Sequence, residues 1–227
     1  MTPPFPDRRA AGRKLAERLV HLAGAQTVVL GLPRGGVPVA DEVARHLNAP
    51  LDIVLVRKIG MPMNPELALG AIAGPQGQTL VLNTELVEHF GIDPATITAQ
   101  AAPQREELAR RSALWGAHLH PDTLAEKVVI LVDDGIATGT TMRAAISVIR
   151  SSDPRRIIVA TPVAAPDTLN QLLALADEVI CLHAPPNFIA VGQHYLCFAQ
   201  VDDAEVRTIL AAARSDRLSC PVIDDDQ

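Results

Sequence analysis

Five short runs of apolar residues alternate along this chain with segments whose apolar residues recur at helical spacing. The runs are TVVLGL from Thr27, LDIVLV from Leu51, VVILV from Val128, IIVATPV from Ile157 and EVICL from Glu178. Because these runs are almost continuously apolar, both faces of each strand must be covered, as in a parallel sheet between helices. The pattern predicts an α/β fold of three layers, with a parallel sheet between two layers of helices.

The chain has 227 residues, a length that fits one domain. We expect that domain to cover residues 1–215, with its core over about residues 25–182. The end of the chain, residues 216–227, finishes in three aspartates and a glutamine and is expected to be disordered. The short runs on either side of GPQG, residues 74–77, predict a β-hairpin, because glycine and proline mark a turn.

Charge and composition restrict the partners. The net charge of −6 argues against nucleic acid, because binding to a phosphate backbone needs clustered positive charge. No run is long and apolar enough to cross a membrane, and the N-terminus has no signal-peptide core. Cys181, Cys197 and Cys220 are too widely spaced for a zinc motif. We therefore expect a cytoplasmic protein with reduced thiols that binds neither nucleic acid nor membrane.

Polar or glycine-rich residues follow three of the predicted strands. Pro33–Gly36 ends the first, Arg57-Lys58 is expected to end the second, and residues 133–141 follow the strand from Val128. Ligands of parallel α/β sheets bind beyond the carboxyl ends of the strands. We therefore expect these three segments to converge on one site, with a flexible loop that begins at Ile59–Glu66 beside it.

The segment VVILVDDGIATGTTM, residues 128–142, combines two kinds of binding group. Its strand delivers Asp133 and Asp134 to the sheet edge, and ionised carboxylates only accept hydrogen bonds, which suits a sugar diol. The loop that follows is rich in glycine and threonine and precedes a helix, whose free amides bind anions. A phosphate next to a diol describes a ribose 5-phosphate.

Other interpretations of this segment fit less well. There is no GK[ST] sequence of a P-loop and no GxGxxG dinucleotide fingerprint. The simplest alternative is that the acids and threonines only cap the helix. Two acids and three threonines within nine residues are more than a cap requires.

The same segment resembles the signature of type I phosphoribosyltransferases that binds 5-phosphoribosyl-1-pyrophosphate (PRPP). In that signature an apolar strand and two acids precede a phosphate loop with a Thr-Gly pair, here Thr138-Gly139. The resemblance implies a Rossmann-like fold of that family with a small hood, in which the acids bind the ribose hydroxyls and the loop binds the 5-phosphate. The implied PRPP-binding residues are Asp133, Asp134, Gly135, Ile136, Ala137, Thr138, Gly139, Thr140 and Thr141.

The segment GLPRGG, residues 31–36, resembles the first pyrophosphate loop of that family. The residues of this loop are Pro33, Arg34, Gly35 and Gly36. The resemblance implies three catalytic residues whose charge stabilises the leaving pyrophosphate, namely Arg34, Arg57 and Lys58. It also implies Mg²⁺ as the cofactor, with Asp133 and Asp134 as indirect ligands through the substrate.

Further segments resemble a branch of the family without an agreed acceptor substrate. They are FPDRRAAGRKLA, NPELALGAI and PNFIAVGQHY, so that the resemblance spans residues 5 to about 210. A hood would consist of the N-terminal segment and about residues 183–213, and Phe188 would stack on the acceptor in its pocket. Arg8 and Arg9 are expected to be surface residues at the start of a helix.

The chain departs from the 6-oxopurine enzymes of that family around the acceptor. Those enzymes have an acid where Ala137 stands and a lysine where the run Val163-Ala164-Ala165 has none. They also have an aspartate where this chain has Gln193-His194. Hypoxanthine and guanine are therefore not expected as acceptors.

Two functions are open at this point. The first is an enzyme that transfers the phosphoribosyl group from PRPP to a small-molecule acceptor. The second is a non-catalytic protein that senses PRPP or a nucleotide on the same fold. The expected partners are PRPP and the acceptor, and a homodimer is a candidate assembly.

Overall fold

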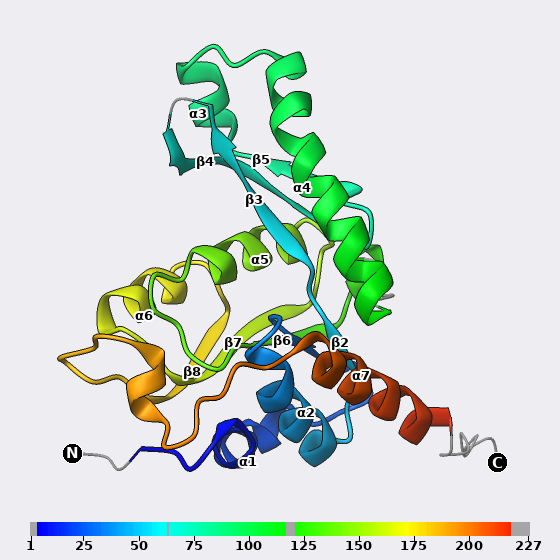
Figure 1. The fold of residues 1–227 in the computed structure, drawn as a ribbon, viewed down its shortest axis with the longest axis vertical. Helices are drawn as coiled ribbons and strands as arrows, with labels where there is room; N and C mark the ends of the chain where they lie inside the picture. The colour runs from blue at the N-terminus through cyan, green and yellow to red at the C-terminus, as the bar shows by residue number, and fades with distance from the viewer. Residues whose placement is uncertain (1–3, 63, 117–120, 219–227) are drawn as a thin grey trace.

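The computed structural model describes residues 4–62, 64–116 and 121–218 (Figure 1). The helices and strands are, in chain order, α1 (Arg8–Leu19), η1 (Val20–Leu22), β1 (Thr27–Gly31), α2 (Gly36–Leu47), β2 (Leu51–Ile53), β3 (Val56–Met61), β4 (Asn64–Ala73), β5 (Thr79–Leu82), α3 (Thr84–His89), α4 (Pro94–Trp115), η2 (Pro121–Leu124), β6 (Val128–Val132), α5 (Thr140–Arg150), β7 (Arg156–Val163), α6 (Pro166–Leu173), β8 (Glu178–His183), η3 (Val191–His194) and α7 (Asp203–Leu218).

A five-stranded sheet of order β2-β1-β6-β7-β8 forms the centre of the fold, and all its neighbouring strands are parallel. The register aligns Thr27 of β1 with Val128 of β6, and Val128 with Arg156 of β7. All of β1 is buried, and so is β6 beyond its first residue. The parallel sheet predicted from the apolar runs is confirmed, and the carboxyl ends of β1 and β6 lie side by side.

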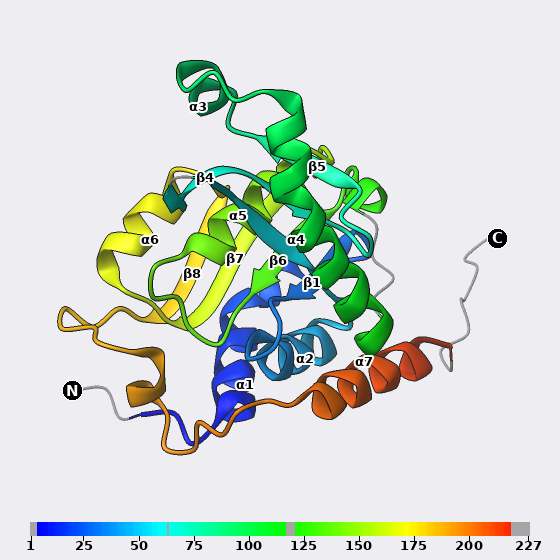
Figure 2. The same ribbon diagram turned by 45° about the horizontal axis from the view of Figure 1, so that its top comes forward.

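Helices cover both faces of this sheet (Figures 1 and 2). The helices α1, α2 and α7 lie on one face, and α5 and α6 lie on the other. Successive residues of a strand point to opposite faces. Val29 and Ile130 accordingly pack in the core under α1 and α2, whereas Leu30 and Leu131 pack in the core under α5. The expected three layers are therefore present.

Between β2 and β6 the chain forms a second sheet, of order β3-β4-β5. Its strands are antiparallel, and β4 and β5 form the hairpin predicted around residues 74–77. One face packs small residues such as Ala71 and Ala73 against Val148 of α5. The other face packs Ile59 and Ile72 near Leu108 of α4. The second sheet therefore lies between α5 and α4.

The prediction that Arg57-Lys58 ends the second strand of the parallel sheet is wrong. β2 ends at Ile53, and both basic residues lie inside β3 of the second sheet. The apolar run from Leu51 conceals this boundary, because Val54 and Leu55 stay buried after the chain has left the parallel sheet. The stretch from Ile59, predicted as a loop, is strand up to Met61.

The N-terminal segment pairs with the segment that precedes α7, near the carboxyl edge of the parallel sheet. The N–H of Phe5 donates to the carbonyl of His194 at 2.8 Å, and the N–H of Leu196 donates to the carbonyl of Phe5 at 2.8 Å. α7 continues to Leu218, so residues 216–218 of the predicted tail are helical, and residues 219–227 lie outside the described residues. Within the described ranges, no helix has both the length and the apolar character needed to cross a bilayer.

Candidate functional site

A pocket of about 370 Å³ lies where the three predicted segments come together. Pro33 reaches it from the end of β1, Arg57 and Lys58 from β3, and Thr140 and Thr141 from the first turn of α5. The predicted convergence of Pro33, the basic pair and the loop after β6 is thus present. The basic residues reach the pocket from the second sheet instead of from the edge of the parallel one.

The loop between β6 and α5 presents backbone amides that have no acceptor. Gly139 precedes the helix with φ +68°, a conformation that glycine adopts without strain. In the described part of the chain, no protein group accepts a hydrogen bond from the amides of residues 137–142. Such amides at a helix N-terminus, reinforced by the helix dipole, form an anion-binding site.

Contacts from neighbouring elements hold this loop in place. Ile136 donates its N–H to the carbonyl of Val163 at 2.9 Å and accepts from the N–H of Ala165 at 3.0 Å. The hydroxyl of Thr168 donates to the carbonyl of Ala137 at 2.6 Å. Arg143 Nη1 donates to the carbonyl of Thr138 at 2.7 Å. Because these bonds fix the loop before a ligand arrives, binding would require little further ordering.

Asp133 and Asp134 directly follow β6 but lie in different surroundings. Asp134 is buried, and its Oδ2 forms an ion pair with Arg8 Nε at 2.7 Å. Asp133 is less completely buried than Asp134, and its Oδ1 accepts a hydrogen bond from the N–H of Asp134 at 2.9 Å. Burial raises the pKa of Asp133, and the neighbouring charge of Asp134 raises that pKa further. The expectation that Arg8 is a surface residue is wrong.

The loop after β1 packs directly against the two acids. A Cβ atom on Gly35 would lie 2.1 Å from Asp134 Oδ2, and one on Gly36 would lie 2.9 Å from the Cα of Asp133. Only glycine therefore allows this approach without displacement. The peptide bond between Pro33 and Arg34 is cis. The loops that follow β1 and β6 form one continuous surface.

Arg34 points away from the pocket. Its Nη1 lies 3.6 Å from Asp203 Oδ1 on α7, and Arg34 is absent from the described lining of the pocket. Of the three residues expected to be catalytic, the structure thus brings Arg57 and Lys58 into the pocket and pairs Arg34 with α7.

Helix α4 supplies three pocket residues that sequence reasoning missed. Arg57 Nε donates to Gln104 Oε1 at 3.1 Å, and Arg111 lines the pocket further along the same helix. Gln104, Leu108 and Arg111 have the i, i+4, i+7 spacing of one helix face. That spacing can be read from the sequence, but it does not tell which element the face meets. None of the described lining residues is acidic, and three are basic.

Phe188 lies apart from this pocket. Its ring stacks on His194, with ring centroids 5.7 Å apart, and it packs against a small cluster that contains Phe5, Val163 and Tyr195. The segment that follows Phe188 still approaches the loop after the acids. Val191 lies so close to Gly135 that a Cβ atom on Gly135 would be 2.3 Å from it. Phe188 thus lies on the side of the acids where the N-terminal segment pairs with residues 194–196.

The donor set near the acids is compatible with Mg²⁺ held together with a substrate. Within the described ranges, no group of three or more His, Cys, Asp or Glu side chains could hold a metal ion. Mg²⁺ is usually bound by one or two carboxylates together with substrate phosphates. The adjacent carboxylates of Asp133 and Asp134 fit that arrangement.

The chain is an α/β protein with two adjacent acids and a glycine- and threonine-rich loop at the carboxyl edge of its parallel sheet. Residues 6–196 match the family described as phosphoribosyl transferase domain, and the chain belongs to that family.

Two proteins of Mycobacterium tuberculosis, from strains CDC 1551 and H37Rv, are both named "putative phosphoribosyl transferase" and are 45% identical to this chain over 220 residues. The match covers 97% of this chain and 49% of each relative, so the chain spans about half the length of the curated relatives it matches. The crystal structure of TT1426 from Thermus thermophilus superimposes with a TM-score of 0.81 at 46% identity. The match covers 92% of this chain and 98% of the Thermus chain.

Proposed function

We propose that the chain binds PRPP along this edge and transfers its phosphoribosyl group to a small-molecule acceptor, with release of pyrophosphate. The observation that carries the proposal is that three kinds of binding group lie together at this edge of the sheet. Adjacent carboxylates suit a ribose diol, unpaired amides at the start of α5 suit a phosphate, and a basic pocket suits a pyrophosphate. These are the parts of PRPP.

Each part of PRPP has a binding place in this proposal. The 5-phosphate binds the amides of residues 137–141 and the hydroxyls of Thr138, Thr140 and Thr141. The ribose hydroxyls bind at the acidic pair. The pyrophosphate extends from the loop at residues 33–36 into the pocket, where Arg57, Lys58 and Arg111 approach it.

The reaction is a displacement at the anomeric carbon of the ribose. The acceptor's lone pair forms the new bond to this carbon while the bond to the pyrophosphate oxygen breaks, and that electron pair leaves with pyrophosphate. Arg57 and Lys58 stabilise the negative charge that develops on the leaving group. Bound Mg²⁺, near Asp133 and Asp134, would supply further neutralisation of phosphate charge. Positioning of donor and acceptor supplies most of the remaining acceleration.

We further propose that the N-terminal segment and the segment from about residue 183 to residue 213 form a hood over the acceptor. The backbone bonds that join Phe5 to His194 and Leu196 support one unit made of both segments. The close approach of Val191 to Gly135 supports a position of this unit against the loop that follows the acids. Phe188, which is partly exposed there, is the candidate to stack on an acceptor ring.

The test separates binding from turnover. Calorimetric titration with PRPP and Mg²⁺ should show binding at one site. Pyrophosphate release should then be measured with a panel of bases, amines and phosphorylated acceptors, and at least one should accelerate it. Binding without acceptor-dependent release across the panel would favour a PRPP sensor, and absence of binding would overturn the proposal.

A further inference from the structure

Three contacts fix the side chain of Arg8 beside the acidic pair. Its Nε donates to Asp134 Oδ2 at 2.7 Å, and its Nη1 donates to the carbonyl of Ala199 at 2.7 Å. Its guanidinium carbon lies 3.9 Å from the centroid of the Phe198 ring. Only 12% of the Arg8 side chain and 13% of the Asp134 side chain are exposed. The ion pair is therefore shielded from water. Two opposite charges attract each other more strongly in such surroundings than at the exposed surface.

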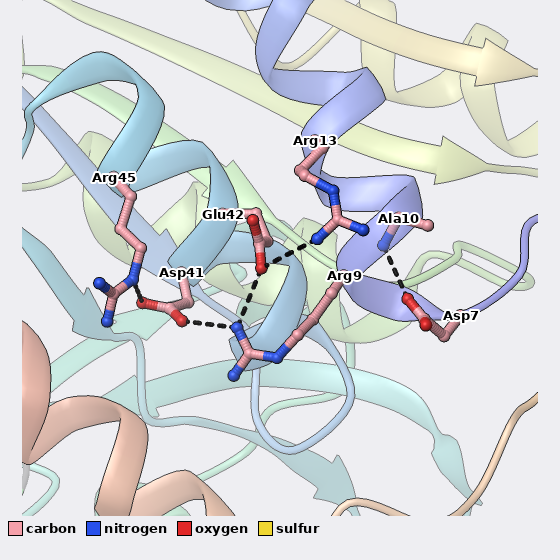
Figure 3. Close-up of polar contacts among 7 residues, drawn as sticks. All are labelled: Asp7, Arg9, Ala10, Arg13, Asp41, Glu42 and Arg45. Atoms are coloured by element: carbon pink, nitrogen blue, oxygen red, sulfur yellow. Dashed lines mark hydrogen bonds and ion pairs between the residues drawn. The ribbon is translucent and has the colours of Figure 1, made fainter.

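Two further arginines on the same helix reach elsewhere (Figure 3). The side chain of Asp7 caps α1 through the N–H of Ala10 at 2.7 Å, which places Arg8 at the first position of the helix. Arg9 and Arg13 both point to Glu42 on α2, at 3.0 and 3.4 Å. Of these three arginines, Arg8 is the one that pairs with a residue of the candidate site.

The carboxylate of Asp134 is enclosed by protein. Oδ2 faces Arg8 and lies so near Gly35 that a Cβ there would be 2.1 Å away. The main-chain carbonyl of Asp134 accepts a hydrogen bond from the Tyr195 hydroxyl at 2.5 Å. Burial raises the pKa of Tyr195, so this hydroxyl stays protonated and remains a donor.

The surroundings of Asp133 differ in two respects, although a Cβ on Gly36 would lie only 2.9 Å from its Cα. It is partly exposed, and in the described part of the chain it forms no ion pair. A sugar hydroxyl at Asp134 would have to share the carboxylate with the charge-assisted bond that Arg8 makes to Oδ2. At Asp133 the hydroxyl would share the carboxylate only with the neutral N–H of Asp134, which donates to Oδ1. The two acids therefore offer a sugar diol unequal binding places.

We propose that the two acids have different tasks, and that Arg8 is the positioning residue that separates them. The inference rests on the proposed function. Asp133 takes the ribose hydroxyls. Asp134, held by Arg8, ties α1 and the segment of Tyr195–Ala199 to the sheet edge and so orients Asp133 through the shared backbone.

The test uses a pair of metal-free probes, ribose 5-phosphate and 2-deoxyribose 5-phosphate, whose dissociation constants give a preference ratio. Wild type should prefer ribose 5-phosphate. Asp133→Asn should abolish this preference, with a loss of roughly tenfold or more in affinity for ribose 5-phosphate. Asp134→Asn and Arg8→Gln should weaken both probes by similar factors and leave the ratio unchanged. Arg8→Lys should bind both probes more tightly than Arg8→Gln does. Arg13→Gln should have the same dissociation constants as wild type.

Each variant is first checked by thermal unfolding. If Arg8→Gln or Asp134→Asn does not fold, the double variant Arg8→Gln/Asp134→Asn is measured instead. It removes both charges, so neither is left buried without its partner. If Asp134→Asn abolished the preference ratio, or if Arg8→Gln left the affinities unchanged, this inference would be overturned but the proposed function would stand. Wild type that binds neither probe would overturn the proposed function together with it.

Discussion

Arg110 and Arg111 share the carboxylate of Glu107, yet only Arg111 lines the basic pocket. Arg110 Nε lies 2.8 Å from Glu107 Oε2, and its side chain is 60% exposed. Hydrogen bonds from both arginines lower the pKa of Glu107 to about 2, so this carboxylate stays ionised at neutral pH. The two arginines therefore form a matched pair with the same partner and different access to the pocket.

We predict that Arg111→Gln weakens PRPP binding by about tenfold, the value of one hydrogen bond to a charged group. Arg110→Gln should change the affinity by less than a factor of about two, as for an exposed ion pair. Calorimetric titration of both variants checks this. Equal losses of PRPP affinity in the two variants would show that Arg111 does not contact the ligand.

Gly35→Ala should destabilise the protein by about 1–3 kcal/mol, because the added methyl overlaps the carboxylate of Asp134. Gly24→Ala is the matched control, since a Cβ at Gly24 meets nothing within 4 Å. Urea unfolding of the two variants measures the difference. A Gly35→Ala protein as stable as wild type would show that the contact between the two loops relaxes freely.

Thr168→Val should weaken phosphate binding while the fold persists, because it removes the bond that holds the Ala137 carbonyl. The loss of stability should be about 0.5–1.5 kcal/mol. Thr208→Val removes a similar hydroxyl-to-carbonyl bond, to Ala204 on α7, and serves as the control. Titration with ribose 5-phosphate should distinguish them, and equal affinities would contradict a loop held in place by Thr168.

The parallel sheet and the glycine- and threonine-rich loop that leads into α5 could be predicted because each follows from a local pattern. Continuous apolar runs require cover on both faces of the strands. The first amides of a helix lack partners within the helix, whatever the position of that helix in the fold. The end of β2 could not be predicted in this way. Val54 and Leu55 are as apolar as the strand before them, although they are buried by packing outside the sheet.

The roles of Arg8 and Arg111 could not be predicted for a different reason. Arg8 acquires its role from Asp134, which is 126 residues away. Arg111 acquires its role from the packing of α4 on β3. Periodicity identifies which side chains share a helix face, but contacts between distant elements decide what that face meets.

Hypoxanthine and guanine should be poor acceptors. Ala137 is exposed in the loop before α5, and Ala164 is fully buried, so neither side chain offers the polar contacts that a 6-oxopurine requires. A buried polar group left without a partner costs about 1–3 kcal/mol. Pyrophosphate release with PRPP, Mg²⁺ and either base should stay at the rate without acceptor. Turnover of roughly 1 per second or faster would show that the acceptor contacts lie elsewhere.

Native thiols should differ in reactivity. Burial raises the pKa of Cys181, whose Sγ donates to the carbonyl of His183 at 3.2 Å, whereas Cys197 is exposed. Since the thiolate is the reactive form, a thiol reagent at neutral pH should label Cys197 much faster than Cys181. Mass spectrometry of a Cys220→Ser protein measures both sites. Equal rates would show that the strand around Cys181 opens readily.

The pairing of β1 with β6 has a consequence for how the chain acquires its ligand site. These strands are neighbours in the sheet although the partners Thr27 and Val128 lie far apart in the chain. Closing so long a loop costs entropy before any contact repays it, so such pairings form slowly. The loop at residues 33–36 extends from β1, whereas the acids and the loop before α5 extend from β6, so the complete site proposed for PRPP exists only when the two strands are paired. During refolding, ligand affinity should therefore emerge in a single step, when β6 docks.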